Sequence, residues 1–117
     1  RSANITCIPA TQSLSDLENE TGDKFKNQII ENCNNYIVLR QNSFKSAEEW
    51  AKTIGTKQTM LMTYQMNEEG STKKGSSRRV REFIVHPDEI KSQGVGEAIY
   101  ISRDRKQCDR IKVFKPF

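Results

Sequence analysis

The order of short apolar runs and helical patterns over the first 55 residues constrains the fold of this chain more than any other feature. Asn4–Ile8 is a β-competent run, and a short helix is expected after it with Ser13 or Ser15 as its N-cap. Asp23–Cys33 places apolar residues at helical spacing, which predicts a second helix. Tyr36–Leu39 is a short apolar run between turn residues, and this pattern predicts a buried, parallel strand.

A third helical pattern completes this order. Ser46–Glu49 reads S-A-E-E, a capping box that predicts a helix start, and Gly55 is the expected stop after Ile54. The resulting β-α-β-α order predicts an α/β fold. The 117 residues leave room for one domain with one modest core, and we expect a single domain over residues 1–117.

The second half of the chain has a different character. Residues 58–66 alternate loosely and fit either a strand or a helical extension, whereas Asn67–Ser77 has no apolar residue and predicts a mobile loop. Arg78–Val85 is expected to be a strand, followed by a turn at His86 and one helical turn that opens at Pro87. Two runs with period-two alternation predict a terminal antiparallel hairpin: Glu97–Ser102 and Arg110–Phe114.

Composition limits the function classes. The chain is 34% hydrophobic and 29% charged, which is polar for an α/β domain that must cover both faces of its sheet, so we expect a thin core or a part of a larger body. The net charge of +4 is too mild to argue for nucleic acid or membrane binding by itself. Three widely spaced cysteines, Cys7, Cys33 and Cys108, have no metal-binding spacing, so we expect reduced thiols and no metal site.

Gln12 is the first candidate for a chemical site. It follows the apolar run Asn4–Ile8, in which Cys7 is expected to be a small core residue, and it precedes the first helix. In open α/β sheets the ligand crevice lies beyond the carboxyl ends of the strands, where such a side chain would be presented. A polar residue that merely leads into a helix explains the same pattern, and the residues alone do not decide between the two.

Two segments resemble the TraD/TraG-type coupling proteins of type IV secretion, which are hexameric, RecA-like, membrane-anchored ATPases. The first is 10–17 (A-T-Q-S-L-S-D-L) with Gly22 closing the turn. The second runs through 77–83 (S-R-R-V-R-E-F), 85–90 (V-H-P-D-E-I) and 96–98 (G-E-A) into the last hairpin. The resemblance implies a partial RecA-like sheet, so that the chain would be the C-terminal fragment of a P-loop ATPase motor domain.

The resemblance also implies a function and its partners. A coupling protein recruits substrate and uses ATP to drive DNA or protein transfer at the cytoplasmic face of the bacterial inner membrane. Its expected partners are other type IV secretion components, the DNA or protein substrate, and further copies in a hexamer. The parent would be membrane-anchored and the fragment itself soluble, and unpaired sheet edges would favour a dimer of the fragment.

Only part of the family's nucleotide site is expected here. The resemblance implies that Gln12 senses the γ-phosphate of ATP or positions the attacking water, and Arg1 lies near the position of a possible arginine finger. The sequence has no G-x-x-x-x-G-K-[S/T] motif and no apolar strand that ends in paired acidic residues. ATP and Mg²⁺ are therefore expected to bind the full-length parent, and this chain alone is not expected to bind a cofactor or hydrolyse ATP.

A basic stretch gives the second candidate site, a surface for substrate or partner binding. Its residues are Lys73, Lys74, Arg78, Arg79 and Arg81. On a strand, Arg79 and Arg81 share one face, where they could contact phosphates, although charges on a solvated strand edge also deter unwanted pairing. Two alternative functions stay open, a non-enzymatic protein-interaction module and a nucleic-acid-binding domain.

Trp50 is expected to pack on the sheet, and three methionines are expected to fill gaps or line an interface: Met60, Met62 and Met66.

Overall fold

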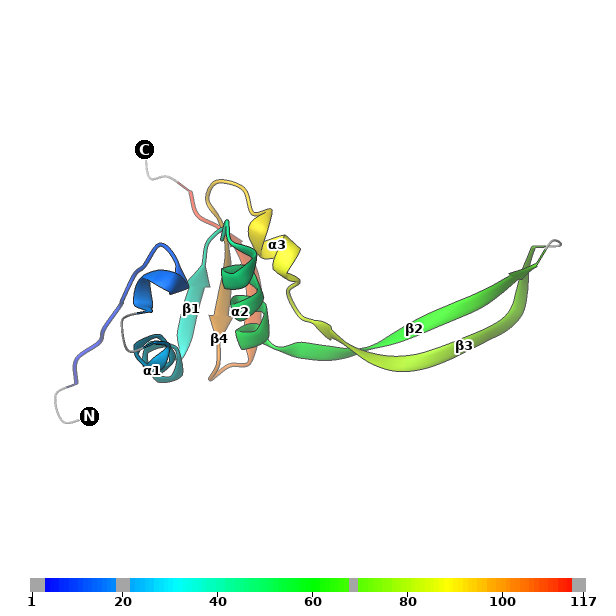
Figure 1. The fold of residues 1–117 in the computed structure, drawn as a ribbon, viewed down its shortest axis with the longest axis horizontal. Helices are drawn as coiled ribbons and strands as arrows, with labels where there is room; N and C mark the ends of the chain where they lie inside the picture. Colours follow the sequence, from blue (N-terminus) through cyan, green and yellow to red (C-terminus); the bar gives the residue numbers. More distant parts are fainter. Residues whose placement is uncertain (1–3, 19–21, 68–69, 115–117) are drawn as a thin grey trace.

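The computed structural model describes residues 4–18, 22–67 and 70–114 and has a mixed α/β fold with two antiparallel sheets (Figure 1). A three-stranded sheet in the order β1-β4-β5 forms a body with the helices, and β2 pairs with β3 in a separate two-stranded sheet. The elements in chain order are the 3-10 helix η1 (Leu14–Leu17), α1 (Lys24–Asn32), β1 (Asn35–Val38), α2 (Phe44–Ile54), β2 (Thr56–Asn67), β3 (Gly70–Phe83), α3 (Pro87–Lys91), β4 (Glu97–Ser102) and β5 (Gln107–Lys112).

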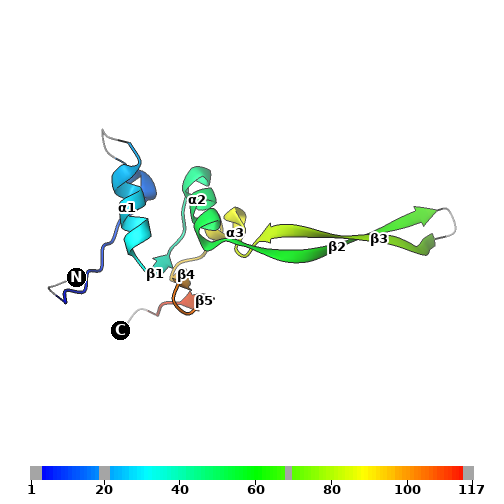
Figure 2. The same cartoon turned by 90° about the horizontal axis from the view of Figure 1, so that it is seen from below.

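The core of the body lies between the three-stranded sheet and the α-helices, which are gathered on one face of that sheet (Figure 2). Tyr36 and Val38 alternate with exposed residues in β1 and pair with Ile101 and Ile99 of β4, so that all four side chains face the helices. Small side chains on α2 allow this helix to approach the sheet closely. The buried cluster consists of Tyr36, Val38, Ala47, Ala51, Val85, Ile90, Ile99 and Ile101.

Tyr36 joins the end of α1 to this core. Its hydroxyl donates hydrogen bonds to the backbone carbonyls of Ile30 and Cys33, the latter at 2.8 Å. The indole of Trp50 meets the Tyr36 ring edge-on with the centroids 5.6 Å apart, which confirms the prediction that Trp50 packs on the sheet. The Arg103 guanidinium lies 5.2 Å from the same ring centroid, in cation–π geometry.

The β2–β3 hairpin, which we call the ribbon, extends far from the body and gives the molecule a longest dimension of 69 Å (Figure 1). Its strands pair from Thr56 opposite Phe83 to Asn67 opposite Gly70. A two-stranded ribbon has no core of its own, so its stability depends on how its base is attached. The backbone N–H of Ile84 donates to the carbonyl of Gly55 at 3.0 Å, and Phe83 packs against the core.

The N-terminal strand prediction is wrong. Asn4–Ile8 has no regular structure, and the side chains of Ile5 and Ile8 are 82% and 89% exposed. Cys7 is likewise exposed rather than part of the core. None of the described strands runs beside this segment, and a β-competent run without a neighbouring strand has no partner for its backbone hydrogen bonds. The short helix that follows does form as predicted, with Ser13 as its N-cap.

The predicted parallel strand is also corrected, and the partial RecA-like sheet is not confirmed. β1 runs antiparallel to β4, and Ile37 on the face away from the helices is 64% exposed. The helix α2 begins at Phe44 with Ser43 as N-cap, so the capping box predicted at Ser46 is absent and Ser46 lies buried inside the helix. The predicted stop is confirmed, since Gly55 follows Ile54 with a φ of +108°.

The mobile loop expected over Asn67–Ser77 is replaced by strand in the described residues, because β2 reaches Asn67 and β3 already begins at Gly70; the two residues 68–69 of the predicted loop lie outside the described residues. A ribbon with water on both faces needs no apolar side chains, so the polar composition of this stretch did not reveal it. The turn and single helical turn are confirmed: His86 caps α3 by accepting the Asp88 N–H at 3.2 Å on Nδ1. The last hairpin is confirmed too, with β5 beginning at Gln107.

Candidate functional site

The ribbon places the predicted arginines on two faces of a projecting structure. In the register of the hairpin, Arg79 lies opposite Met60 and Arg81 opposite Gln58, and directly opposed residues share a face. Arg78 lies on the other face, opposite Leu61, as the period-two prediction requires. We call the surface formed by Gln58, Met60, Met62, Ser77, Arg79 and Arg81 the arginine face.

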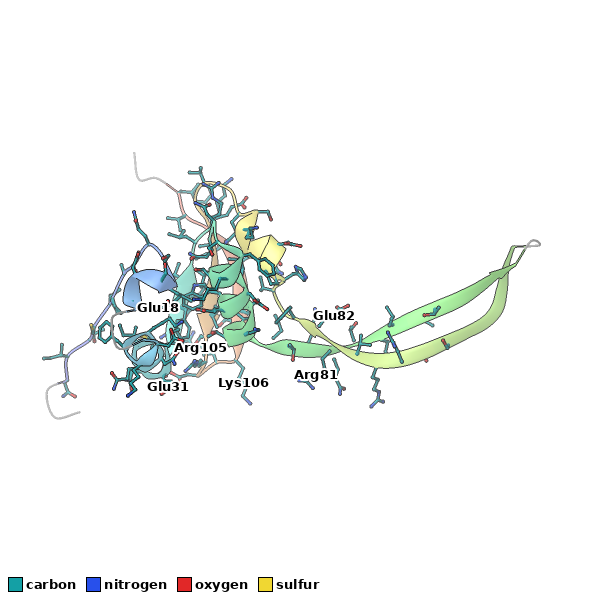
Figure 3. All side chains as sticks on the ribbon, in the orientation of Figure 1. Glu18, Glu31, Arg81, Glu82, Arg105 and Lys106 are labelled. Carbon is teal, nitrogen blue, oxygen red and sulfur yellow. The ribbon has the colours of Figure 1, made fainter. Side chains whose placement is uncertain are left out.

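All three arginine side chains are exposed. The Nε atom of Arg81 donates a hydrogen bond to the Thr56 hydroxyl at 3.1 Å, which fixes this arginine near the base of the ribbon. Figure 3 shows Arg81 and Glu82 on opposite sides of β3, as expected for neighbours on a strand. Lys73 and Lys74 belong to β3 by their backbone, but their side chains lie outside what the structure describes.

Exposed apolar side chains lie beside these arginines. Met60 is 57% exposed, Leu61 41% and Met62 61%. Methionine is flexible and polarizable, so it adapts to varied partner surfaces, and methionine with arginine is a composition enriched at protein interfaces. The ribbon thus combines multiple hydrogen-bond donors with adaptable apolar area on a structure that stands away from the body. This combination is typical of a binding surface.

Gln12 belongs to the irregular segment before η1, and this segment lies on the side of the body away from the ribbon (Figure 1). The side chain of Gln12 is exposed. The segment is attached to the body by Leu14, whose side chain is 2% exposed. The backbone N–H of Ser13 donates to Asp16 Oδ2 at 3.2 Å and completes the turn after Gln12. Arg1, the possible arginine finger, lies outside the described residues.

An ion-pair cluster that the sequence did not indicate attaches η1 to the helices. The side chain of Lys26 is only 6% exposed, and its Nζ atom lies 2.9 Å from Glu18, 3.2 Å from Glu49 and 3.4 Å from Asp23. Burial by itself would lower the pKa of Lys26, but the carboxylates of Glu18 and Glu49 outweigh it and raise that pKa. Lys45 adds a second contact to Glu18 at 3.3 Å, and hydrogen bonds from the two lysines lower the pKa of Glu18.

A second ion pair joins α3 to the terminal hairpin. The guanidinium of Arg110 donates to both carboxylate oxygens of Glu89, with Nη2 2.9 Å from Oε2. This two-point contact lowers the pKa of Glu89 and raises that of Arg110. Both ion-pair clusters therefore connect separate elements of the body, and neither touches the ribbon. Within the described ranges, no group of three or more His, Cys, Asp or Glu side chains is arranged to hold a metal ion.

A comparison with family models identifies the family of this chain. A family model described as the TraM recognition site of TraD and TraG matches residues 1–94. The chain belongs to this family. The match runs from the N-terminal segment through α3 and includes the whole ribbon, so the resemblance to TraD/TraG-type coupling proteins is confirmed. A search of curated proteins finds no match to the chain. Among the described helices, none is both long and apolar enough to cross a bilayer.

Proposed function

We propose that this chain is a partner-recruiting part of a TraD/TraG-type coupling protein, and that the arginine face of the ribbon contacts a TraM-type partner. One observation carries the proposal: the region matched as a TraM recognition site contains the entire ribbon, which extends away from the body. Because the ribbon extends away from the body, a partner can reach both its faces without displacing packed side chains (Figure 1).

The chemistry of the arginine face indicates the partner surface that fits it. Arg79 and Arg81 each present a planar guanidinium that binds carboxylates through two parallel hydrogen bonds. Met60 lies directly opposite Arg79 and supplies apolar area beside the charges. The matching surface on the partner is therefore acidic next to an apolar area.

The test measures binding of purified TraM to the chain by calorimetry. The double variant Arg79→Glu/Arg81→Glu should bind at least about tenfold more weakly, because charged contacts of this kind fix affinity and orientation. Arg105→Glu is the matched control, since Arg105 is an exposed arginine in the β4–β5 turn of the body (Figure 3). Equal affinity of the double variant and the wild type would refute the assignment of the arginine face.

We further propose that the full-length parent uses ATP and Mg²⁺ to drive DNA or protein transfer at the inner membrane as a hexamer, with Gln12 as its phosphate sensor. The exposed position of Gln12 next to a fixed helical turn leaves it free to meet a nucleotide bound elsewhere in the parent or on a neighbouring subunit. Gln12→Ala in the full-length protein should lower ATP hydrolysis by about a hundredfold while nucleotide binding is retained. If hydrolysis is unchanged, Gln12 is not the phosphate sensor and is only a polar residue before the helix.

Nucleic acid is a second candidate ligand, favoured by the shape of the ribbon. A two-stranded β-ribbon fits the major groove of B-DNA, and Arg78, Arg79 and Arg81 would meet phosphates from its two faces. Three phosphate contacts would give a slope of about −2.7 for log K against log salt. Removal of the three arginines should then abolish most of this slope, whereas binding without a salt dependence would exclude DNA as the ligand of the ribbon.

A further inference from the structure

The two strands of the ribbon differ in how well their outer edges are protected. β3 carries five basic residues, Lys73, Lys74, Arg78, Arg79 and Arg81, whereas β2 has no charged residue from Gln58 to Asn67. Charged side chains are a common means by which natural proteins prevent strand edges from pairing with other chains. Of the strands that the structure describes, β3 alone pairs with β2. The other edge of β2 is therefore long and uncharged, and no strand of the described structure pairs with it.

The sequence of β2 is symmetric about Leu61. Thr59–Thr63 reads T-M-L-M-T, so the same residues follow in either direction from the centre. If two copies of β2 lie antiparallel with Leu61 opposite Leu61, Met60 lies opposite Met62 and Thr59 opposite Thr63. In an antiparallel pair, every second residue directs its backbone N–H and C=O groups toward the partner strand. On β2 one such set includes Leu61 and the other includes Met60 and Met62, and the symmetric register can form with either set.

We propose that the outer edge of β2 pairs with β2 of a second copy of this chain, in an antiparallel arrangement with its two-fold axis at Leu61. The four strands then form one sheet in the order β3-β2-β2-β3. Cross-strand threonine and apolar pairs are favourable contacts, and a two-fold interface requires the same surface on both copies. The exposed fractions of Met60 and Leu61 leave area for the partner to cover.

Charge supports a second copy as the occupant. The two β3 strands lie at the outside of the four-stranded sheet, about 14 Å apart at a spacing of about 4.8 Å per strand. This separation exceeds the screening length of about 8 Å at physiological ionic strength, so the arginines of the two copies repel each other little. Pairing through β3 would instead bring the basic residues of both copies together. The two-fold axis is perpendicular to the sheet, so both arginine faces lie on the same side.

The first test is sedimentation of the chain over a range of concentrations, without any partner protein, so that its outcome is independent of the recruitment proposal. Leu61→Glu places two carboxylates opposite each other across the two-fold axis, and we expect the dimer dissociation constant to rise about tenfold or more. Within one ribbon the new glutamate faces Arg78, so the hairpin itself is not disrupted. Ser76→Glu is the control, because it adds the same charge to the same face of the ribbon on β3.

The second test checks the register by disulfide formation in a Cys7→Ser background. Opposed residues in an antiparallel pair have Cα atoms about 4.5–5.5 Å apart, within reach of a disulfide. Leu61→Cys should therefore link to itself, and a mixture of Thr59→Cys with Thr63→Cys should form the mixed dimer. Thr59→Cys alone should link poorly, because its two copies are four residues or about 13 Å apart along the strands.

Three results would overturn the proposal. The first is a wild-type chain that stays monomeric at every concentration. The second is a dimer that Leu61→Glu leaves unchanged while circular dichroism shows intact folding. The third is a dimer in which Thr59→Cys alone links as efficiently as the mixture, since this would assign the contact to another register or another edge.

Discussion

Gly96 offers the sharpest test of the packing at the end of the terminal hairpin. It belongs to the G-E-A triplet 96–98, has a φ of +78°, and accepts the backbone N–H of Val113 at 2.6 Å. A Cβ added at Gly96 would meet the carbonyl oxygen of Val113 at 2.7 Å, closer than such atoms approach in real proteins. Gly96→Ala must therefore displace backbone at the end of β5, where no flexible side chain can move aside.

Gly22 is a control with nearly the same backbone conformation. Its φ is +84°, and a Cβ there would meet no atom of the described residues within 4 Å. A left-handed conformation costs alanine about 1–2 kcal/mol at either glycine. Overpacking against backbone adds about 1–3 kcal/mol at Gly96 alone. We expect Gly96→Ala to lower the free energy of unfolding by about 3 kcal/mol and Gly22→Ala by about half of that.

Thermal unfolding followed by circular dichroism measures the difference. At about 4 °C per kcal/mol for a domain of this size, the melting temperature should fall by about 12 °C for Gly96→Ala and about 6 °C for Gly22→Ala. Equal losses would refute the reasoning, because they would mean that only the left-handed conformation matters and that the contact with Val113 is relieved without cost.

Three further predictions concern the body. Lys26→Met leaves Glu18 and Glu49 without their lysine, so it should lower the free energy of unfolding by about 1–3 kcal/mol and speed hydrogen exchange in η1. Lys24→Met, at an exposed position of α1, should have neither effect. Because Arg110 lowers the pKa of Glu89, this ion pair stabilises the fold fully above the ordinary glutamate pKa and less as the pH falls. Glu89→Gln should therefore make the urea midpoint decline less steeply below about pH 5. The same decline in the variant and the wild type would contradict this. Ile99→Ala, at a side chain that is 1% exposed, should cost about 2–5 kcal/mol in urea unfolding, and a loss below about 1 kcal/mol would contradict its place in the core.

Features that depend on neighbouring residues were predictable from the sequence. The N-cap at Ser13, the helix stop at Gly55 and the start of α3 at Pro87 all follow from local hydrogen bonding and backbone conformation, and all three are found. The packing of Trp50 and the terminal hairpin follow from helical and period-two spacing, and both are found as well. The N-cap, the helix stop and the start of α3 depend on residues a few positions apart, although the capping box predicted at Ser46 was equally local and was wrong.

Features that depend on distant partners were not predictable. Ile5 and Ile8 favour a strand but have no neighbouring strand in the described structure, so they remain exposed. The run at Tyr36–Leu39 indicates a strand, but its direction depends on β4, more than fifty residues later in the chain. Lys26 looks like a surface residue of a helix, because its partners Glu18 and Glu49 come from two other elements.

The candidate site was predicted in part for the same reason. Period-two spacing placed Arg79 and Arg81 on one face and Arg78 on the other, which the register confirms. The methionines were expected to fill gaps or line an interface, but their place beside the arginines was missed. Met60 adjoins Arg79 only through hairpin pairing between residues nineteen positions apart. The role of Gln12 remains a prediction, because it concerns a nucleotide site that these residues do not complete.

Outside the ribbon, the residues that resemble the coupling-protein family in the second half of the chain serve mainly to hold the fold together. Val85 and Ile90 are fully buried, His86 caps α3, Glu89 binds Arg110, and Gly96 has no room for a side chain. These residues stabilise the body from which the ribbon extends. The hydrogen bond from the Ile84 N–H to the Gly55 carbonyl closes the base of the ribbon. Most of the ribbon, 56–76, lies outside the segments that carry the resemblance and has no core to maintain. Its side chains can therefore differ between family members that bind different partners. Exchange of the ribbon between two members of the family should transfer partner specificity from one to the other.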